Sequence, residues 1–249
     1  SEFREATIID ISHNIDAFNV AEAAYIIGAS YSSFPKGTVH LIGVDIELNN
    51  ENQHIAMQWN DHYFICADNG ILSMLTQKIV PQKLVAITIH DRLPNDATDM
   101  DVFVKVSCLL AKGGLLNVIG KEIKSIKEVT ELQAVVNENQ IKGYVTYIDH
   151  FGNVVTNISK KMFLETAKSR PYELKFKRQI IKTILPKYSD IGISEKYPLK
   201  YYEGQKLAIF NEAGFLEIAI FRSNPDTVGS ATSLLGLSYR DVVTIEFRK

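Results

Sequence analysis

The sequence predicts an α/β protein with two domains: an N-terminal α/β layered, Rossmann-like domain and a smaller C-terminal β-barrel-like domain. Short apolar strands alternate with helical segments through residues 1–120, which is typical of a layered α/β domain. Residues 121–140 are charged and lack a clear hydrophobic period, so we expect the linker between the domains there. In residues 141–249 short strands follow one another with little helix, which favours a small barrel or sandwich.

Hydrophobic periodicity places the elements of the first domain. The helix over residues 19–30 is indicated by the spacing of Val20, Ala23 and Ile27 on one face, and Asn19 is able to cap it. Further strands are predicted at residues 7–12, 38–45, 53–58, 62–67 and 84–89, and further helices at residues 71–77 and 101–111.

The second domain begins with a strand, a polar turn and another strand over residues 143–158. Residues 144–148 alternate in the manner of a half-buried strand, and a β-rich run resumes at Val154. Other strands are predicted at residues 172–178, 205–210, 215–221 and 241–247, and helices at residues 160–168 and 228–235.

Composition excludes several classes of protein. A net charge of −2 and a pI near 6.3 provide no basic field, so we expect no nucleic-acid partner. The apolar runs are far shorter than the ~20 residues of a membrane span, and no signal peptide precedes the first predicted strand. Cys66 and Cys108 lie in apolar surroundings, which favours buried thiols in a reducing cytoplasm.

Common metal and nucleotide motifs do not occur. The sequence contains no HExxH, no cysteines paired at zinc spacing, and no histidines at i, i+4. It also contains neither a P-loop nor a GxGxxG. We therefore expect no metal and no bound cofactor.

The segment over residues 143–158, with its polar turn at residues 149–153, is the most informative feature of the chain. It places the carboxylate of Asp149, the ring of Phe151 and the carboxamide of Asn153 beside Gly152, which allows close backbone approach. Such a set could hold the hydroxyls of a ribose or the head group of an amino acid. The alternative is a hairpin in which Asp149 and Asn153 only satisfy the turn backbone.

This turn also resembles a family signature. The run IDHFGNVVTNI is similar to that of the S-adenosylmethionine (SAM) hydroxide adenosyltransferases, which are related to the SAM-dependent fluorinase and chlorinase. Other segments resemble the family in the same order, at residues 8–27, 34–45, 64–73, 213–220 and 233–237.

The resemblance implies a reaction and an assembly. Water attacks the 5′ carbon of the adenosyl group, and adenosine and methionine are the products. The family site lies between the N domain of one subunit and the C domain of its neighbour in a trimer. Family members also carry an earlier strand and helix with a ribose-contacting aspartate, and this sequence has no counterpart of that segment.

Three residues are the candidates for activating water. Asp45 ends a predicted strand, where ligands of open α/β sheets bind, although it could instead cap a loop. The resemblance implies that Asp45 belongs to an Asp-Arg-His set, in which Asn52 and Thr98 replace the arginine and the histidine. These side chains could orient water but cannot lower its pKa by positive charge. His54 is a possible stand-in, although a lone strand histidine is more often structural.

The loss of the charged pair leaves three functions open. A SAM hydrolase is the leading hypothesis, and a non-catalytic protein that binds SAM or adenosine is the alternative. Halide-dependent adenosyl transfer is disfavoured, because Asp99 stands where relatives place a halide-contacting serine or glycine.

The resemblance implies further substrate contacts. Asp149, Phe151 and Asn153 match residues that hold the methionine amino group and the ribose region. The remaining candidates are Phe18, Asp68, Asn69, Phe221 and Arg222.

Each of these remaining candidates has a structural alternative. Phe18 could be a hydrophobic staple residue, and Asp68 with Asn69 could serve turn chemistry alone. Phe221 could be core material at a strand end, with Arg222 following it.

Overall fold

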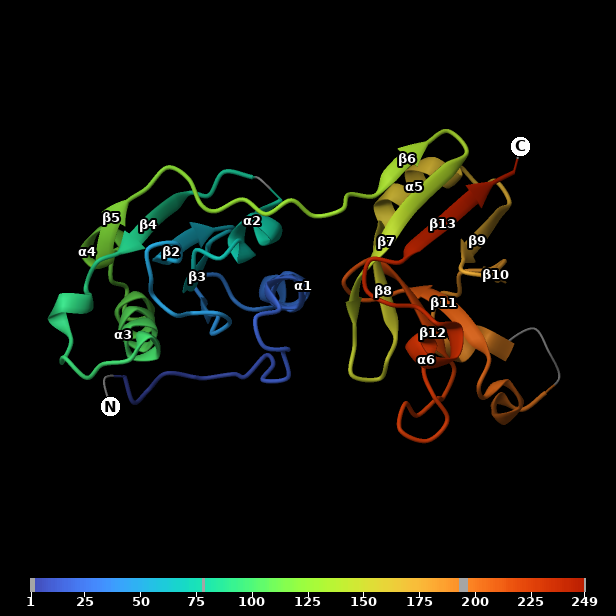
Figure 1. The fold of residues 1–249 in the computed structure, drawn as a ribbon, viewed down its shortest axis with the longest axis horizontal. Coiled ribbons are helices and arrows are strands. Elements are labelled where there is room, and N and C mark those ends of the chain that lie inside the picture. Colours follow the sequence, from blue (N-terminus) through green and yellow to red (C-terminus); the bar gives the residue numbers. More distant parts are fainter. Residues whose placement is uncertain (1–2, 78, 193–196, 249) are drawn as a thin grey trace. The chain divides into compact units, whose positions relative to one another are not determined.

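A computed structural model describes residues 3–77, 79–192 and 197–248 and divides the chain into two compact units (Figure 1). The units are Ser1–Thr130 and Glu131–Lys249. The division falls within residues 121–140, the predicted linker, although residues 121–122 and 135–137 of that range belong to strands. None of the helices in the described part of the chain has the length and apolar character needed to cross a membrane.

The first unit is built on a five-stranded sheet with the order β1-β3-β2-β4-β5. Its strands are β1 (Val39–Leu41), β2 (His54–Trp59), β3 (His62–Ala67), β4 (Lys83–Ile87) and β5 (Gly120–Glu122). Its helices are α1 (Val20–Ser30), α2 (Ile71–Thr76), α3 (Asp99–Ala111) and α4 (Leu116–Ile119), with short 3-10 segments η1 (Tyr31–Ser33) and η2 (His90–Arg92).

Helices cover both faces of this sheet. Ile55 and Met57 of β2 pack with α1 and α2 in one apolar cluster, whereas Ala56 packs with α3 and α4 in another. Successive side chains of a strand point to opposite faces, so a strand covered on both sides is apolar throughout. This arrangement confirms the predicted layered α/β class.

The direction of the strands determines where polar residues gather. β1 runs parallel to β3, while β2 pairs antiparallel with both β3 and β4. Consequently β1, β3 and β4 run in the same direction and end at the edge where β2 begins. The turn Asn60–Asp61, with φ of 48° and 63°, joins β2 to β3 at the opposite edge.

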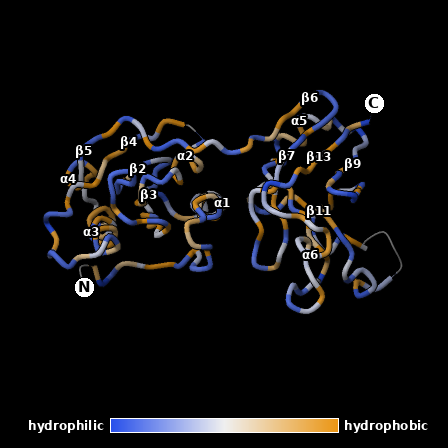
Figure 2. The backbone as a smooth tube through the Cα atoms, in the orientation of Figure 1, coloured by the Kyte–Doolittle hydropathy of each residue, from blue (hydrophilic) through white to orange (hydrophobic). Residues whose placement is uncertain are grey.

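Two predicted strands differ from the structure. Residues 7–12 belong to neither sheet, although the segment that follows the N-terminus contains hydrophobic stretches (Figure 2). Ile8 and Ile9 are 84% and 62% exposed. β propensity alone does not provide the neighbouring strand that a ladder of hydrogen bonds requires. The strand predicted over residues 38–45 is shortened to β1, because the chain turns before Asp45, whose φ is +49°.

The second unit is an antiparallel eight-stranded sheet with the order β10-β9-β13-β7-β8-β12-β11 and with β6 beside β7. Its strands are β6 (Val135–Asn137), β7 (Gln140–Ile148), β8 (Val154–Ser159), β9 (Tyr172–Phe176), β10 (Gln179–Ile181), β11 (Lys206–Phe210), β12 (Phe215–Ile220) and β13 (Val242–Phe247). Its helices are α5 (Lys160–Ala167) and α6 (Ala231–Leu235), with 3-10 segments η3 (Tyr188–Gly192) and η4 (Leu199–Tyr202).

The sheet of the second unit is barrel-like, as predicted. The pairing register shifts between Val145 and Tyr147 and again between Phe215 and Glu217. Such bulges bend a sheet and increase its twist, which lets it wrap around a core. That core includes the inward residues Ile141, Val154, Leu174, Ile218 and Ile245.

Two buried histidines contact each other in the first unit. His40 Nε2 lies 3.2 Å from His62 Nδ1, and the His40 ring stacks on Phe64 with centroids 4.9 Å apart. Burial lowers the pKa of His40 from 6.5 to about 4, and the charge of His62 adds to this effect. Folding therefore favours the neutral form of His40.

We expect this burial to make stability depend on pH. Because the folded-state pKa of about 4 lies below the unfolded value of 6.5, the contribution is fully present above pH 6.5 and is lost as pH falls toward 4. The pKa difference corresponds to at most about 3 kcal/mol in the free energy of unfolding. Urea unfolding at several pH values, followed by fluorescence of the single tryptophan Trp59, measures it. His40→Leu should flatten the dependence, and an equally steep slope in that variant would contradict the assignment.

Candidate functional site

Polar residues of the first unit gather where β1, β3 and β4 end and β2 begins. We call this group the polar edge, and contacts among its members and with the loop after Asp45 connect all of them. Its members are Asp45, Asn52, His54, Asn69, His90 and Asp99. Strand direction brings the predicted residue Asn69, at the exit of β3, against the loop that carries Asp45 and Asn52. Ligands of α/β sheets bind at this kind of edge.

Asp45 lies on a loop that side-chain amides hold by its backbone. Asn52 Nδ2 donates to the carbonyl oxygens of Asp45 at 2.9 Å and of Glu47 at 3.2 Å. Asn69 Nδ2 donates to Val44 O at 2.9 Å. Within the described residues no hydrogen bond or ion pair engages the Asp45 carboxylate. The carboxylate is therefore free to accept a proton or to orient a water molecule.

Asn52 is 6% exposed, and its amide orientation is determined by its contacts. Two carbonyl oxygens face the amide nitrogen, so a flipped amide would place an acceptor against two acceptors. Oδ1 is buried, and among the described residues it has no hydrogen-bond partner. Asn52 thus orders the Asp45 loop through its amide nitrogen.

Thr98 has a local role that the sequence analysis missed. Its hydroxyl accepts from Asp101 N and donates to Asp101 Oδ2 at 2.7 Å, which forms a capping box at the start of α3. The hydrogen bond from Thr98 lowers the pKa of Asp101. Helix α3 therefore begins at Asp99 rather than at residue 101 as predicted, and the Thr98 hydroxyl is committed to the cap.

Asp68 and Asn69 follow β3 and bind backbone groups of their own unit. Asp68 Oδ1 accepts from Lys127 N at 2.8 Å, and burial raises the pKa of Asp68. Asn69 Oδ1 accepts from Ile71 N at 3.2 Å at the start of α2. These contacts give both residues a role in the fold and bring Asn69 against the Asp45 loop.

His90 and Asp99 complete the polar edge. His90 had not been predicted as a site residue, and Asp99 had been considered only at the position of a halide contact. His54 Nδ1 lies 3.0 Å from His90 Nε2, and His54 Nε2 lies 3.7 Å from Asp99 Oδ1. His54 is 1% exposed. His90 could have been found from its position, because it follows the end of β4, a strand that ends at the same edge as β1 and β3.

The turn of the second unit joins β7 to β8. Asp149 Oδ1 accepts from Asn153 N at 2.8 Å, and Asp149 Oδ2 accepts from Asn153 Nδ2 at 2.9 Å. Phe151 projects from this turn and is 64% exposed. The structure therefore brings together the three predicted residues Asp149, Phe151 and Asn153, with the ring accessible and the carboxylate oriented by the amide.

The start of α6 packs against this turn. Gly152 has φ of +72°, and a Cβ at this position would overlap Ser230 and lie 3.1 Å from Thr232 Oγ1. Thr232 N donates to Gly152 O at 3.3 Å. Ser230 is buried, and its hydroxyl lies 2.6 Å from Thr232 Oγ1. These hydroxyls were missed because α6 is remote from the turn in sequence.

The remaining predicted residues lie in different surroundings. Phe18 has φ of +62° and is 77% exposed, so it does not act as a hydrophobic staple. Phe221 is buried in an apolar cluster with Tyr202 and Leu207, which favours its structural role. The Arg222 guanidinium lies 5.4 Å from the Phe221 ring centroid.

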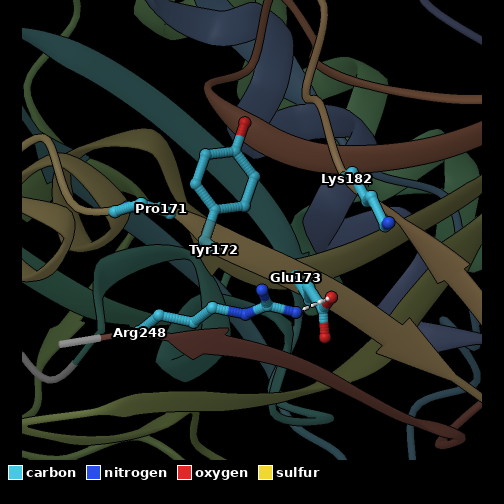
Figure 3. Close-up of a pocket in the computed structure, with 5 residues that line it drawn as sticks. All are labelled: Pro171, Tyr172, Glu173, Lys182 and Arg248. Carbon is cyan, nitrogen blue, oxygen red and sulfur yellow. Dashed lines mark hydrogen bonds and ion pairs between the residues drawn. The ribbon is translucent and has the colours of Figure 1, made fainter.

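A pocket of about 280 Å³ lies elsewhere in the second unit (Figure 3). Its lining consists of Pro171, Tyr172, Glu173, Lys182 and Arg248, with an ion pair between Glu173 and Arg248. None of the predicted site residues lines it. In the described part of the chain no three His, Cys, Asp or Glu side chains are grouped so as to hold a metal ion.

Both units match domains of one known protein family. Residues 1–120 match the SAM hydroxide adenosyltransferase N-terminal domain, and residues 143–244 match the C-terminal domain of the same family. A Methanocaldococcus jannaschii protein named (R)-S-adenosyl-L-methionine hydrolase is 27% identical over 247 residues, covering 97% of this chain and 84% of its own. A fluorinase from Actinopolyspora mzabensis is 22% identical over 247 residues, covering 87% of this chain and 81% of its own.

Solved structures share the fold. An uncharacterized conserved protein from Thermotoga maritima superposes with a TM-score of 0.80 and 27% identity, covering 97% of this chain and 89% of its own. A conserved hypothetical protein from Thermus thermophilus has a TM-score of 0.69 and 21% identity, covering 95% of this chain and 86% of its own. The second similarity supports the fold alone.

Substitution of Gly152 should disrupt the turn more than substitution of a comparable glycine. Gly152→Ala combines a left-handed backbone with overlap against Ser230, whereas Gly214, at φ of +79°, has no atom within 4 Å of an added Cβ. Overlap in a packed site costs about 1–3 kcal/mol beyond the backbone strain that both variants share. Urea unfolding of Gly152→Ala and the matched control Gly214→Ala measures this difference, and equal destabilisation would refute it.

Proposed function

Because the chain belongs to the SAM hydroxide adenosyltransferase family, we propose that it hydrolyses SAM to adenosine and L-methionine. Water or hydroxide forms a bond to the adenosyl 5′ carbon as the bond from that carbon to sulfur breaks. The electron pair of the broken bond stays on sulfur and converts the sulfonium to the neutral thioether of methionine. The attacking water releases one proton, so the reaction needs a group to orient and deprotonate water but no acid for the leaving group.

The Asp45 carboxylate at the polar edge, which no hydrogen bond or ion pair engages among the described residues, is the observation that carries this proposal. In it, Asp45 orients the water and attracts its proton. Asn52 supports Asp45 through the backbone of the loop. Thr98 contributes by capping α3, which positions Asp99 at the same edge.

The charge of the polar edge suits a cationic substrate. Asp45 and Asp99 are both at this edge, and carboxylates attract a sulfonium. The same charges oppose the binding of a halide anion, which argues against halide-dependent adenosyl transfer. The similarity to a hydrolase over 97% of this chain is consistent with water as the nucleophile.

Residues of the second unit are proposed to hold the substrate. The Asp149 carboxylate and the Asn153 amide form a polar pair suited to the methionine amino group or to ribose hydroxyls. Phe151 offers an exposed aromatic face. Phe18 and Arg222 are exposed and are secondary candidates for contacts with the ligand.

The proposal extends to the state of the protein in the cell. We expect a homotrimer in the cytoplasm that uses SAM as substrate and requires no separate cofactor. Cys66 and Cys108 are both free thiols, as a reducing compartment favours. Sedimentation analysis of the purified protein tests the trimer.

A non-catalytic SAM- or adenosine-binding protein is the alternative. The observation that favours it is the lack of charge on the two residues that, by resemblance, replace the arginine and the histidine of the family's Asp-Arg-His set. Asn52 and Thr98 carry no charge, and the Thr98 hydroxyl is already used by Asp101. Neither residue supplies the positive charge that lowers the pKa of a water molecule.

Incubation with SAM in water labelled with oxygen-18 tests hydrolysis. We expect adenosine carrying the label at its 5′ hydroxyl, together with unlabelled methionine, followed by chromatography and mass spectrometry. Asp45→Asn keeps the shape of the side chain but removes its charge, and should lower kcat by about 10²–10⁴. Asp61→Asn, at the opposite edge of the same sheet, is the matched control and should retain activity.

Calorimetric titration with SAM and with adenosine separates the two functions. Tight binding without products above the uncatalysed background would support the binding protein and refute hydrolysis. Equal activity in Asp45→Asn and the wild-type protein would refute the role of Asp45.

A further inference from the structure

We propose that His54 and His90 are positioning residues for Asp45, linked in a two-histidine chain that fixes the loop over residues 45–48. This inference rests on the proposed function, because the loop carries the carboxylate assigned to water. It concerns residues outside the predicted catalytic set, one of them fully buried and the other at the exit of β4.

The contacts determine which nitrogen of each ring carries a proton. His54 Nε2 lies 2.8 Å from Ile46 O, and a carbonyl oxygen only accepts, so Nε2 must be the donor. In the neutral His54 ring Nδ1 is then an acceptor. His90 Nε2, 3.0 Å away, must donate to it. The chain therefore runs from His90 through His54 to the backbone next to Asp45.

Loop residues 45–48 are held one after another. Asn52 binds the carbonyl oxygens of Asp45 and Glu47. His54 binds the carbonyl oxygen between them, and Asp99 Oδ2 accepts from Leu48 N at 3.1 Å. Backbone contacts on each residue from 45 to 48 leave the loop little freedom, which pre-orients the Asp45 side chain.

The ring of His54 is confined as well as hydrogen-bonded. Phe103 of α3 meets it edge-on, with centroids 4.7 Å apart and planes at 69°. Its side chain is 0% exposed, and the Asp99 carboxylate faces Nε2 at 3.7 Å. Packing and hydrogen bonds therefore restrict the rotation of the ring.

His90 completes the hydrogen bonding of the buried His54 ring. If its donor is removed, His54 Nδ1 is left as a buried acceptor without this partner, which disfavours the observed position of the ring. The contact of His54 Nε2 with Ile46 O, and with it the order of the loop, is then weakened. The charged groups around His90 are His54, Asp91 and Asp99; burial and His54 lower its pKa, and the two carboxylates oppose that effect. A proton added at His90 Nδ1 leaves the Nε2 donor in place.

Nitrogen-15 NMR of histidine side chains tests the chain without any turnover. We expect His54 to be protonated on Nε2 and His90 on Nε2, with both rings identified from spectra of the single variants. A His54 ring protonated on Nδ1 in the wild-type protein would overturn the inference, whatever the enzymatic activity.

Kinetics test the effect on catalysis. His90→Gln keeps an N–H donor near the position of Nε2, and should hold kcat within about 3-fold, because it preserves the geometry of the loop. His90→Phe removes the donor and should lower kcat about 10- to 100-fold, with KM for SAM changed much less. The same split is expected between His54→Gln and His54→Phe.

A matched control separates positioning from general packing. His62→Phe changes a buried histidine at the opposite edge of the same sheet and should leave kcat unchanged while affecting stability. Equal kcat in folded Gln and Phe variants at position 90 would overturn the positioning role. Absence of hydrolysis in the wild-type protein would refute the proposed function instead, and the ring spectra would still decide whether the histidine chain exists.

Discussion

The antiparallel placement of β2 between β3 and β4 is the constraint on which the candidate site depends. It makes β1, β3 and β4 end at one edge, where β2 begins. Loops that leave three separate strands then meet there, together with the first residue of a fourth, His54. The buried apolar faces of the sheet fix the register, since a slip by one residue would exchange the two helix-covered faces.

The Asp45 loop is held by an amide, an imidazole and a carboxylate, each acting on the backbone of the loop rather than on the Asp45 side chain. Binding a loop by its backbone orders a catalytic group while leaving its carboxylate uncommitted. In the proposed reaction Asn52 and Thr98 bring no positive charge to the water, so its orientation has to supply more of the rate enhancement.

In the second unit a hairpin turn holds a carboxylate in place. Asp149 and Asn153 satisfy each other and the turn backbone, so the structural and functional explanations of this motif are compatible. Gly152 allows the start of α6 to lie against the turn, and the hydroxyls of Ser230 and Thr232 close that contact. The ring of Phe151 remains outside this packing and is available to a ligand.

The sequence by itself determined the features that depend on local pattern. The hairpin of β2 and β3, the capped helix α1 and the strands around the Asp149 turn follow from periodicity and turn chemistry, and the family follows from motifs in order. Tertiary structure decided the rest. The segment over residues 7–12 has β propensity but lies in neither sheet, and Phe221 is a core residue because of its neighbours. The contact of His54 with His90 joins residues 36 positions apart. Such pairings depend on strand order and direction, which no local pattern encodes.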